Sequence, residues 1–223
     1  MKYLIHSCPK RSWYVNEHMI PLMRAQGIQK KDIKVWKDAD GIGNLASFVA
    51  SCEWIGENCD LDESTWHLQD DVVVSKRFLE EAEKPHIGFK NGFCNEIFDG
   101  ERTNYIGSTT VNGMWFSFQC ILIPNWVAAD FAKWFREECI PKGLYPEYVS
   151  TGKCDDSLFR EWSMEHIDLP ALNVYPNIAD HIDYLIGGTV INKQRIGEKR
   201  TAYWRDKDLD DAVQELKERL KKI

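Results

Sequence analysis

Residues 66–74 read WHLQDDVVV, an apolar segment that stops at two adjacent aspartates and then continues as apolar. Paired carboxylates repel one another and are costly to bury, so a chain that builds such a pair usually supplies a cation to balance it. Hard oxygen ligands suit Mg²⁺ or Mn²⁺, which commonly bridge to substrate phosphates. Asp70 and Asp71 therefore indicate a divalent-metal site for a nucleoside diphosphate. The alternative is that they only cap the turn or helix that follows at 75–78, because Asp favours both positions.

The residues before this stretch place it at the end of the third strand of a parallel sheet. Strand patterns occur at 3–6, 33–36 and 65–68, and helical patterns at 13–23 and 44–55 separate them. Strands that alternate with helices predict right-handed crossovers and a largely parallel sheet. Ligands bind such sheets at the carboxyl ends of the strands, which is where the two aspartates fall.

The rest of the chain adds further elements. We expect more helices and strands, with Asn125 as one helix cap: helices at 75–83, 127–138, 155–162 and 209–220, and strands at 87–89, 105–106 and 114–123. These later strands predict mixed or antiparallel pairing. A chain of 223 residues is long enough for one full core. The sequence therefore predicts a single α/β, Rossmann-like domain with a mixed, mostly parallel sheet flanked by helices.

Composition excludes several classes of protein. Hydrophobic residues make up 43% of the chain and charged residues 28%, as in globular rather than disordered proteins. The net charge of -7 argues against strong non-specific binding to nucleic acid or to an anionic membrane. No apolar stretch approaches the length of a membrane span or of a signal-peptide core, which predicts a cytoplasmic protein. The seven cysteines include no Cys-x-x-Cys pair, so we expect reduced thiols rather than disulfides or a zinc site.

Taken in order, four motifs resemble the GT-A class of nucleotide-sugar-dependent glycosyltransferases over roughly residues 2 to 190. The first is LQDDV at 68–72, which is similar to the acidic metal-binding motif of that class. The likeness is greatest to the Glu-Asp-Asp-Val form of lipooligosaccharide and collagen glycosyltransferases, with Gln69 in place of the first acid. The second is GMWFSF at 113–118, which with the ILIP that follows resembles the central strand beside the acceptor pocket.

The other two motifs lie in the second half of the chain. The two acids at 155–156 are similar to the second acidic motif of the class, whose final acid often serves as the catalytic base. YPNIADH at 175–181 resembles the segment that carries a late metal-binding histidine, and LIGGT at 185–189 resembles its sequel. Small phage-encoded glycosyltransferases have a similar appearance.

The resemblance implies a set of site residues. Asp71, Asp70 and His181 would hold Mn²⁺ or Mg²⁺, which neutralises the charge that grows on the departing diphosphate. Asp156 first, and Asp155 second, would accept the proton of the attacking hydroxyl as general base, and direct displacement would invert the anomeric centre. Capping of their own helix is the alternative for these two acids, and a structural hydrogen bond is the alternative for the histidine.

Contacts with the donor nucleotide are expected from three further regions. Pro9, Lys10 and Arg11 after the first strand, and Asp38 after the second, lie where the class contacts its donor. Lys193 opens a stretch rich in basic residues and interleaved with aromatics. That stretch is interpreted as a lid over the diphosphate, a track for an anionic polymer or a solvated surface segment.

The resemblance also implies substrates, and two other functions compete with it. A UDP-sugar is the default donor, and the acceptor is a hydroxymethylated base of phage DNA or a surface glycan. Residues 1–70 would form the nucleotide-binding half, 71–190 the acceptor half, and 191–223 a C-terminal loop and helix. Two alternatives stay open. One is a non-catalytic nucleotide- or sugar-binding module, which the missing first acid at Gln69 allows. The other is a nucleotidyltransferase, against which the glycine-free HSCPKR at 6–11 argues.

Overall fold

The structure is a computed structural model that describes residues 2–38, 41–93, 109–111, 118–152, 155–174, 176–187, 202 and 205–222. Its strands are β1 (Lys2–Ser7), β2 (Ile33–Lys37), β3 (Ser64–Gln69), β4 (Val72–Val74), β5 (Phe89–Asn91), β6 (Thr109–Val111), β7 (Cys120–Pro124), β8 (Ala171–Asn173) and β9 (Ala179–His181). Its α-helices are α1 (Ser12–Tyr14), α2 (Ile20–Ala25), α3 (Asn44–Asn58), α4 (Phe78–Ala82), α5 (Asn125–Trp134), α6 (Ile140–Lys142), α7 (Pro146–Thr151), α8 (Asp155–His166) and α9 (Lys207–Leu220). The shorter helical segments are η1 (Pro9–Arg11), η2 (Val15–Met19), η3 (Lys30–Asp32), η4 (Phe135–Cys139) and η5 (Asp183–Leu185). Within the described ranges, no helix combines the length and the apolar character needed to cross a bilayer.

Seven of the described strands form one sheet in the order β2-β1-β3-β7-β5-β8-β6. β1 pairs in parallel with β2 and β3, as strands separated by helices predict. β7 runs antiparallel to β3 and β5, β8 is parallel to β5, and β6 is antiparallel to β8. Strands β1, β2, β3, β5 and β8 therefore share one direction, and β7 and β6 oppose it. This confirms an α/β fold with a mixed, mostly parallel sheet flanked by helices.

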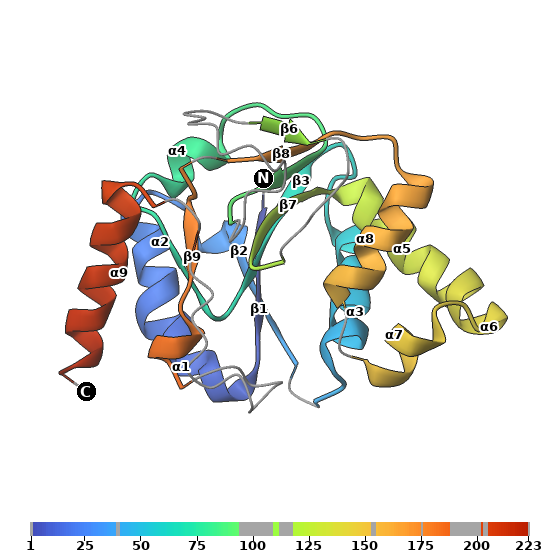
Figure 1. The fold of residues 1–223 in the computed structure, drawn as a ribbon, viewed down its shortest axis with the longest axis horizontal. Helices are drawn as coiled ribbons and strands as arrows, with labels where there is room; N and C mark the ends of the chain where they lie inside the picture. Colours follow the sequence, from blue (N-terminus) through green and yellow to red (C-terminus); the bar gives the residue numbers. More distant parts are fainter. Residues whose placement is uncertain are drawn as a thin grey trace.

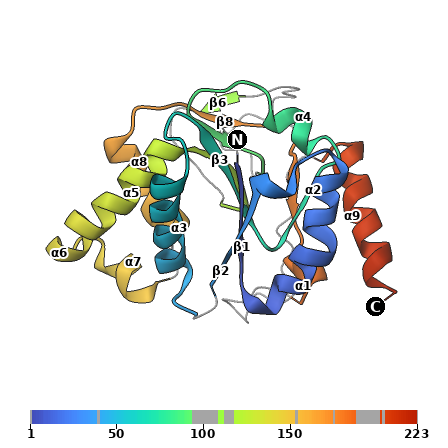
Figure 2. The same cartoon turned by 180° about the vertical axis from the view of Figure 1, so that it is seen from behind.

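Helices cover both faces of this sheet. Helices α1, α2 and α9 lie over one face, and α3, α5 and α8 lie over the other (Figures 1 and 2). Tyr3 and Ile5 of β1 join the core on the α1, α2 and α9 side, whereas Leu4 joins the core on the opposite side. Successive side chains of a strand point to opposite faces, so a strand covered on both faces has a continuous apolar sequence.

A second, two-stranded sheet begins directly after β3. The chain turns at Asp70 and Asp71 and continues as β4, which pairs antiparallel with β9 so that Val72 lies opposite His181. All three valines of β4 are buried in the core on the α9 side. The apolar sequence that resumes after the aspartates is therefore a new strand, and the acid pair, Asp70 and Asp71, occupies the junction between the two sheets.

Some predicted boundaries are wrong. The helix expected at 75–83 is limited to α4, because the chain at Ser75 is still paired with the segment before β9 through a hydrogen bond from its N–H to the Ile178 carbonyl (2.8 Å). The strand expected at 87–89 begins only at Phe89. Gly88 precedes it with φ of 93°, a left-handed conformation that does not continue a strand.

The expected cap at Asn125 is also wrong, because Asn125 is the first residue of α5 and its side chain bonds elsewhere. Its Oδ1 accepts from Thr65 Oγ1 (2.7 Å), and its Nδ2 donates to the Asp60 carbonyl (2.7 Å). The strand expected at 105–106 lies outside the described residues. So does the first part of the segment at 114–123, whose described portion forms β7.

Candidate functional site

Backbone hydrogen bonds hold the acid pair at the carboxyl end of β3. Gln69 donates its N–H to the Gln119 carbonyl (3.1 Å), and the Asp71 carbonyl accepts the Ile182 N–H (2.8 Å). The turn is thereby attached to the chain before β7 on one side and to the chain after β9 on the other. Asp70 and Asp71 are each only 7% exposed. Neither caps α4, which excludes the helix-capping alternative for the pair.

Arg11 bridges the two carboxylates. It ends the helical turn η1 that follows β1, and it is only 5% exposed. Its Nη1 donates to Asp70 Oδ1 (3.0 Å) and to Asp71 Oδ2 (2.5 Å), while the Cys8 N–H donates to Asp70 Oδ2 (2.7 Å). A guanidinium suits this position because it stays charged and directs several N–H donors from one plane. The cation that the acid pair predicts is thus supplied here by the chain itself.

His181 joins the acid pair from β9. Its Nε2 lies 3.2 Å from Asp71 Oδ2, and its side chain is buried. Asp180, which is fully buried, fixes this part of the chain. Its Oδ1 accepts the N–H groups of His181 (2.9 Å) and Ala202 (2.5 Å), and its Oδ2 accepts from Arg205 Nη1 (3.1 Å). The structure therefore brings together the aspartates and the histidine to which the resemblance assigns the metal.

Burial and charge make the two carboxylates unequal. Burial alone would raise the pKa of Asp71, but His181 and Arg11 lower it to about 2. The pKa of Asp70 is raised, because burial and the charge of Asp71 outweigh Arg11 and the backbone N–H that Asp70 accepts. Burial acts to lower the pKa of His181, yet Asp71 raises it overall. Asp71 is therefore the permanent anion of the pair, and Asp70 is protonated more readily.

The acid pair lines a cavity of about 170 Å³ at the carboxyl ends of β1 and β3. Its walls come from β1 and η1, the start of α3, the end of β3 and the start of α8. Five side chains predicted for the site line it: Arg11, Asp38, Asp70, Asp71 and Asp155. Residues from four separate parts of the sequence thus meet at one cavity, in the location where α/β sheets bind ligands.

The second acidic motif begins α8, and its two acids have different surroundings. Asp155 lines the cavity, where burial and then the charge of Asp156 raise its pKa to about 7. Asp156 does not line the cavity. Its Oδ1 accepts the Ser157 N–H (2.8 Å) and the Ser157 hydroxyl (3.4 Å). Asp156 is therefore engaged in local hydrogen bonds at the start of its own helix. Asp155 lines the cavity, so the geometry favours Asp155 as the acid that can contact a substrate.

Asp38 lines the same cavity, but its carboxylate also organises the loop before α3. Its Oδ1 accepts the Ile42 N–H (2.9 Å), and its Oδ2 accepts the Gly43 N–H (3.3 Å). Both hydrogen bonds hold the backbone that leads into the helix at the cavity rim. Asp38 is therefore placed to shape the site, with part of its hydrogen-bonding capacity already used.

The other expected donor contacts lie elsewhere. Pro9 and Lys10 are exposed and do not line the cavity. Lys193 lies outside the described residues, together with most of the basic stretch that it opens. Arg205, at the end of that stretch, is paired with Asp180 rather than presented to an anionic ligand.

Two histidines that the sequence patterns left without a role also line the cavity. His6 Nε2 lies 3.1 Å from His67 Nδ1, and the two rings stack with centroids 5.3 Å apart. Burial lowers the pKa of His6 to about 4 and that of His67 well below its usual range, so both rings are neutral at pH 7. His6 and His67 lie near the carboxyl ends of two adjacent strands, where α/β sheets bind ligands. Their positions in the two predicted strands could therefore have indicated a place at the site.

Comparison with protein families and with curated proteins provides no family for this chain. No protein-family model matches the chain, and no curated protein matches it. One architecture hosts many unrelated reactions, so the fold alone does not give a function. The function has to be argued from the residues of the cavity.

The donor set fits a hard divalent cation in its chemistry. Carboxylate oxygens and an imidazole nitrogen are suitable ligands for Mn²⁺, and Asp71 Oδ1 is buried without a hydrogen-bond partner in the described chain. In the present arrangement, no three His, Cys, Asp or Glu side chains of the described residues converge into a closed metal centre. Arg11 binds one oxygen of each aspartate in this arrangement.

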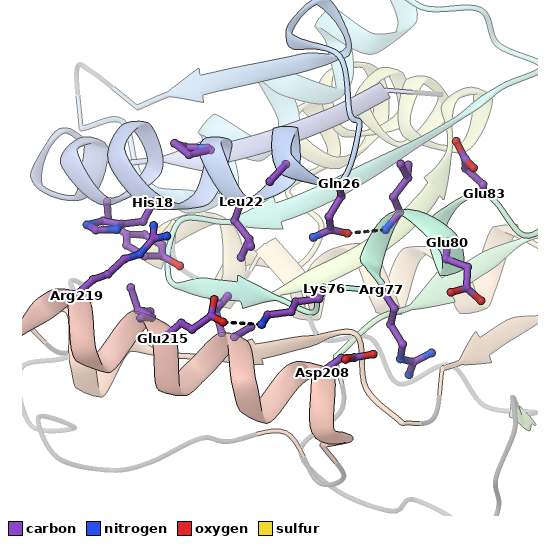
Figure 3. Close-up of a pocket in the computed structure, with 17 residues that line it drawn as sticks. His18, Leu22, Gln26, Lys76, Arg77, Glu80, Glu83, Asp208, Glu215 and Arg219 are labelled. Carbon is purple, nitrogen blue, oxygen red and sulfur yellow. Dashed lines mark hydrogen bonds and ion pairs between the residues drawn. The ribbon is translucent and has the colours of Figure 1, made fainter.

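A larger cavity of about 950 Å³ lies between α2, the segment from β4 to α4, and α9 (Figure 3). Lys76 and Glu215 form an ion pair across it (2.5 Å), and Gln26 Oε1 accepts the Leu79 N–H (3.0 Å). None of the predicted site residues that the structure describes lines this cavity. The smaller cavity at the acid pair is the candidate site, because the predicted site residues meet there.

Proposed function

We propose that this protein transfers a sugar from a nucleotide-sugar donor, a UDP-sugar in the first instance, to an acceptor hydroxyl with inversion. The observation that carries the proposal is that Asp155 and the acid pair line the same cavity. Glycosyl transfer requires neutralisation of charge at the departing diphosphate and a base at the attacking hydroxyl. Both kinds of group are present in this one cavity.

The diphosphate end of the donor is assigned to the acid pair and the start of α3. Asn44, the first residue of α3, lines the cavity, and a helix N-terminus attracts phosphate through its free N–H groups and its dipole. A divalent cation held by Asp71, Asp70 and His181 would act as a Lewis acid toward the leaving diphosphate. Arg11 lines the same cavity and is another source of positive charge for the diphosphate.

Asp155 is the proposed base, ahead of Asp156. A carboxylate with a pKa of about 7 is largely ionised just above neutral pH and is still basic enough to take a proton as the hydroxyl attacks. The acceptor oxygen bonds to the anomeric carbon, and its proton passes to Asp155. The bond from that carbon to the diphosphate breaks, and its electron pair leaves with the nucleoside diphosphate. Attack from the side opposite the leaving group inverts the anomeric centre.

The size of the cavity limits which part of the donor it holds. Small-molecule sites usually measure roughly 300 to 1,000 Å³, and this cavity measures about 170 Å³. It is large enough for a diphosphate and the reacting carbon but not for a whole nucleotide sugar. The nucleobase and most of the sugar therefore extend beyond the described walls.

For the acceptor we propose a hydroxyl of a surface glycan or of a hydroxymethylated DNA base, and for the location the cytoplasm. Free thiols support a reducing compartment, because all five cysteines in the described chain are unpaired. Cys52 and Cys120 are fully buried, and burial raises the pKa of each thiol. Such thiols stay protonated and unreactive, as expected of residues that serve only as part of the core.

The test is thermal unfolding of the purified protein with UDP, GDP, CDP, ADP and dTDP, each with Mn²⁺ and with chelator. A ligand at about a hundred times its dissociation constant adds roughly 2.7 kcal/mol of stability, which is easily measured. A shift for one nucleotide, followed by release of that nucleotide from its sugar conjugate when acceptor is added, is the expected result. If no nucleotide stabilises the protein, the proposal is wrong.

A further inference from the structure

We infer that Arg11 is the resident counter-cation of the acid pair, and that a divalent metal ion and the Arg11 guanidinium exclude one another there. The inference rests on the proposed function only for the identity of the metal. It concerns the order of events at the site: binding of a metal ion requires that Arg11 first release both aspartates. Arg11 then governs how tightly the metal binds.

The hydrogen bonds of the carboxylates impose this competition. Arg11 Nη1 occupies Asp70 Oδ1 and Asp71 Oδ2, the Cys8 N–H occupies Asp70 Oδ2, and His181 Nε2 also contacts Asp71 Oδ2. Asp71 Oδ1 is the carboxylate oxygen without a hydrogen-bond partner in the described residues. A metal ion that bridges both aspartates therefore has to take an oxygen of Asp70 that is already held, either by Arg11 or by the Cys8 N–H.

Charge leads to the same conclusion. The two carboxylates and the guanidinium alone carry one net negative charge when both acids are ionised, and protonation of His181 beside Asp71 brings the four groups to neutrality. A divalent cation added beside an undisplaced Arg11 would make the cluster positive in a location where both aspartates are only 7% exposed. Like charges within a few ångströms of each other and away from water repel strongly. The metal ion and the guanidinium are therefore alternatives and not partners.

The position of Arg11 allows it to leave. It is the last residue of the short turn η1 and already lines the cavity. A guanidinium that releases the aspartates has an equivalent anion to bind once a diphosphate enters, because phosphate oxygens accept the same forked pair of hydrogen bonds. Metal binding without nucleotide is consequently weak in the natural protein.

The experiment measures Mn²⁺ binding to the full chain without nucleotide, by the electron paramagnetic resonance signal of free Mn²⁺. Arg11→Met removes the guanidinium and keeps an apolar stem, so we expect the dissociation constant for Mn²⁺ to fall at least tenfold. Arg11→Lys retains the charge but presents a single ammonium, so a smaller fall is expected. Lys10→Met removes the neighbouring exposed charge and should leave the constant within twofold. Circular dichroism verifies that each variant is folded.

The possible outcomes separate this inference from the proposed function. Tighter binding by Arg11→Met or Arg11→Lys than by the natural protein supports competition. This includes the case in which only the variants bind Mn²⁺, which would also remove the metal from the proposed reaction. Equal or weaker binding by both variants means that Arg11 prepares the aspartates for the metal, which overturns the inference and leaves a metal-dependent transferase intact. Absence of binding in every protein overturns it as well, while nucleotide binding and sugar transfer still test the function.

Discussion

His181 Nε2 lies 3.2 Å from Asp71 Oδ2, a contact that joins the end of β9 to the turn between β3 and β4. The register of the two-stranded sheet produces it, because Val72 is paired with His181 and the preceding residue is Asp71. The contact also defines the protonation state of the site, since His181 is the main influence that opposes burial and keeps Asp71 ionised.

Replacement of His181 by Ala should destabilise the protein, because it removes a buried partner from a buried charge. Loss of such a hydrogen bond costs about 1–3 kcal/mol, measured by urea unfolding at pH 7. His166→Ala is the matched control, because His166 is exposed and its Nδ1 only bonds the Trp162 carbonyl of its own helix (2.8 Å). An equal loss in both variants would show that the contact with Asp71 contributes nothing.

Stability should depend on pH through Asp155, whose folded-state pKa is raised to about 7. The unfolded value is near 3.9, so below about pH 4 the carboxyl is protonated in both states and costs nothing. As the pH rises from about 4 to 7, the unfolded chain ionises first and the folded state loses stability, until the loss is complete above the folded pKa. Asp155→Asn removes this loss.

We therefore expect the melting temperature of Asp155→Asn to exceed that of the natural protein by an amount that grows from about pH 4 to pH 7 and is constant above. Scanning fluorimetry across this range makes the comparison. Asp130→Asn is the control, because Asp130 is an exposed aspartate of α5 and is not among the groups that raise the pKa of Asp155. A difference that does not change with pH would contradict the assignment of the raised pKa.

Sugar transfer should separate the same two acids. Asp155→Asn keeps the size of the side chain and loses its basicity, so kcat should fall by about 10²- to 10⁴-fold, the usual contribution of a general base. Donor binding should change little, because the diphosphate is assigned to other residues. Asp156→Asn should retain kcat within a few-fold. The measurement is steady-state kinetics with release of the nucleotide as the readout. A large fall in kcat for Asp156→Asn and a small one for Asp155→Asn would identify Asp156 as the base.

Asn125 should be needed for stability rather than for activity. It is fully buried and connects β3 to the loop before it through Thr65 and Asp60. Asn125→Ala leaves two polar groups without their partner, at a cost of about 1–3 kcal/mol in urea unfolding. Asn58→Ala removes an exposed hydrogen bond to the Trp54 carbonyl and should change stability by less than about 0.5 kcal/mol. Similar values for the two variants would refute the structural role.

The parallel half of the sheet could be predicted from the sequence because its signals are local. Short, largely apolar runs define β1, β2 and β3 within a few residues each, and parallel pairing follows from the helices between them. The position of the acid pair at the end of β3 then follows from chain order alone. The joining of His181 to Asp71 depends instead on the register of β9, which no short stretch of sequence specifies.

Arg11 shows where prediction from the sequence ends. The sequence places a cation after the first strand, but it does not show which way the side chain points. A nucleotide outside the protein and an acid pair inside it are equally suitable partners for a guanidinium. The direction is set by η1, which returns the chain toward β3 and buries Arg11 while Lys10 stays exposed. The same limit applies to Asn125. Its residue type favours helix caps, but its buried side chain instead bonds Thr65 and the Asp60 carbonyl.

The pairing of β4 with β9 also implies an order of folding. Segments far apart in the sequence meet slowly, because the loop between them must lose its entropy before their contact forms. Arg11 can reach the aspartates as soon as β1 and β3 are paired, whereas His181 arrives only when β9 docks and Asp180 has bound Ala202. Arg11 can thus offset one of the two negative charges before β9 has docked. The contact between His181 and Asp71 is therefore expected to form after that of Arg11 with the aspartates, because β9 lies far beyond β3 in the chain.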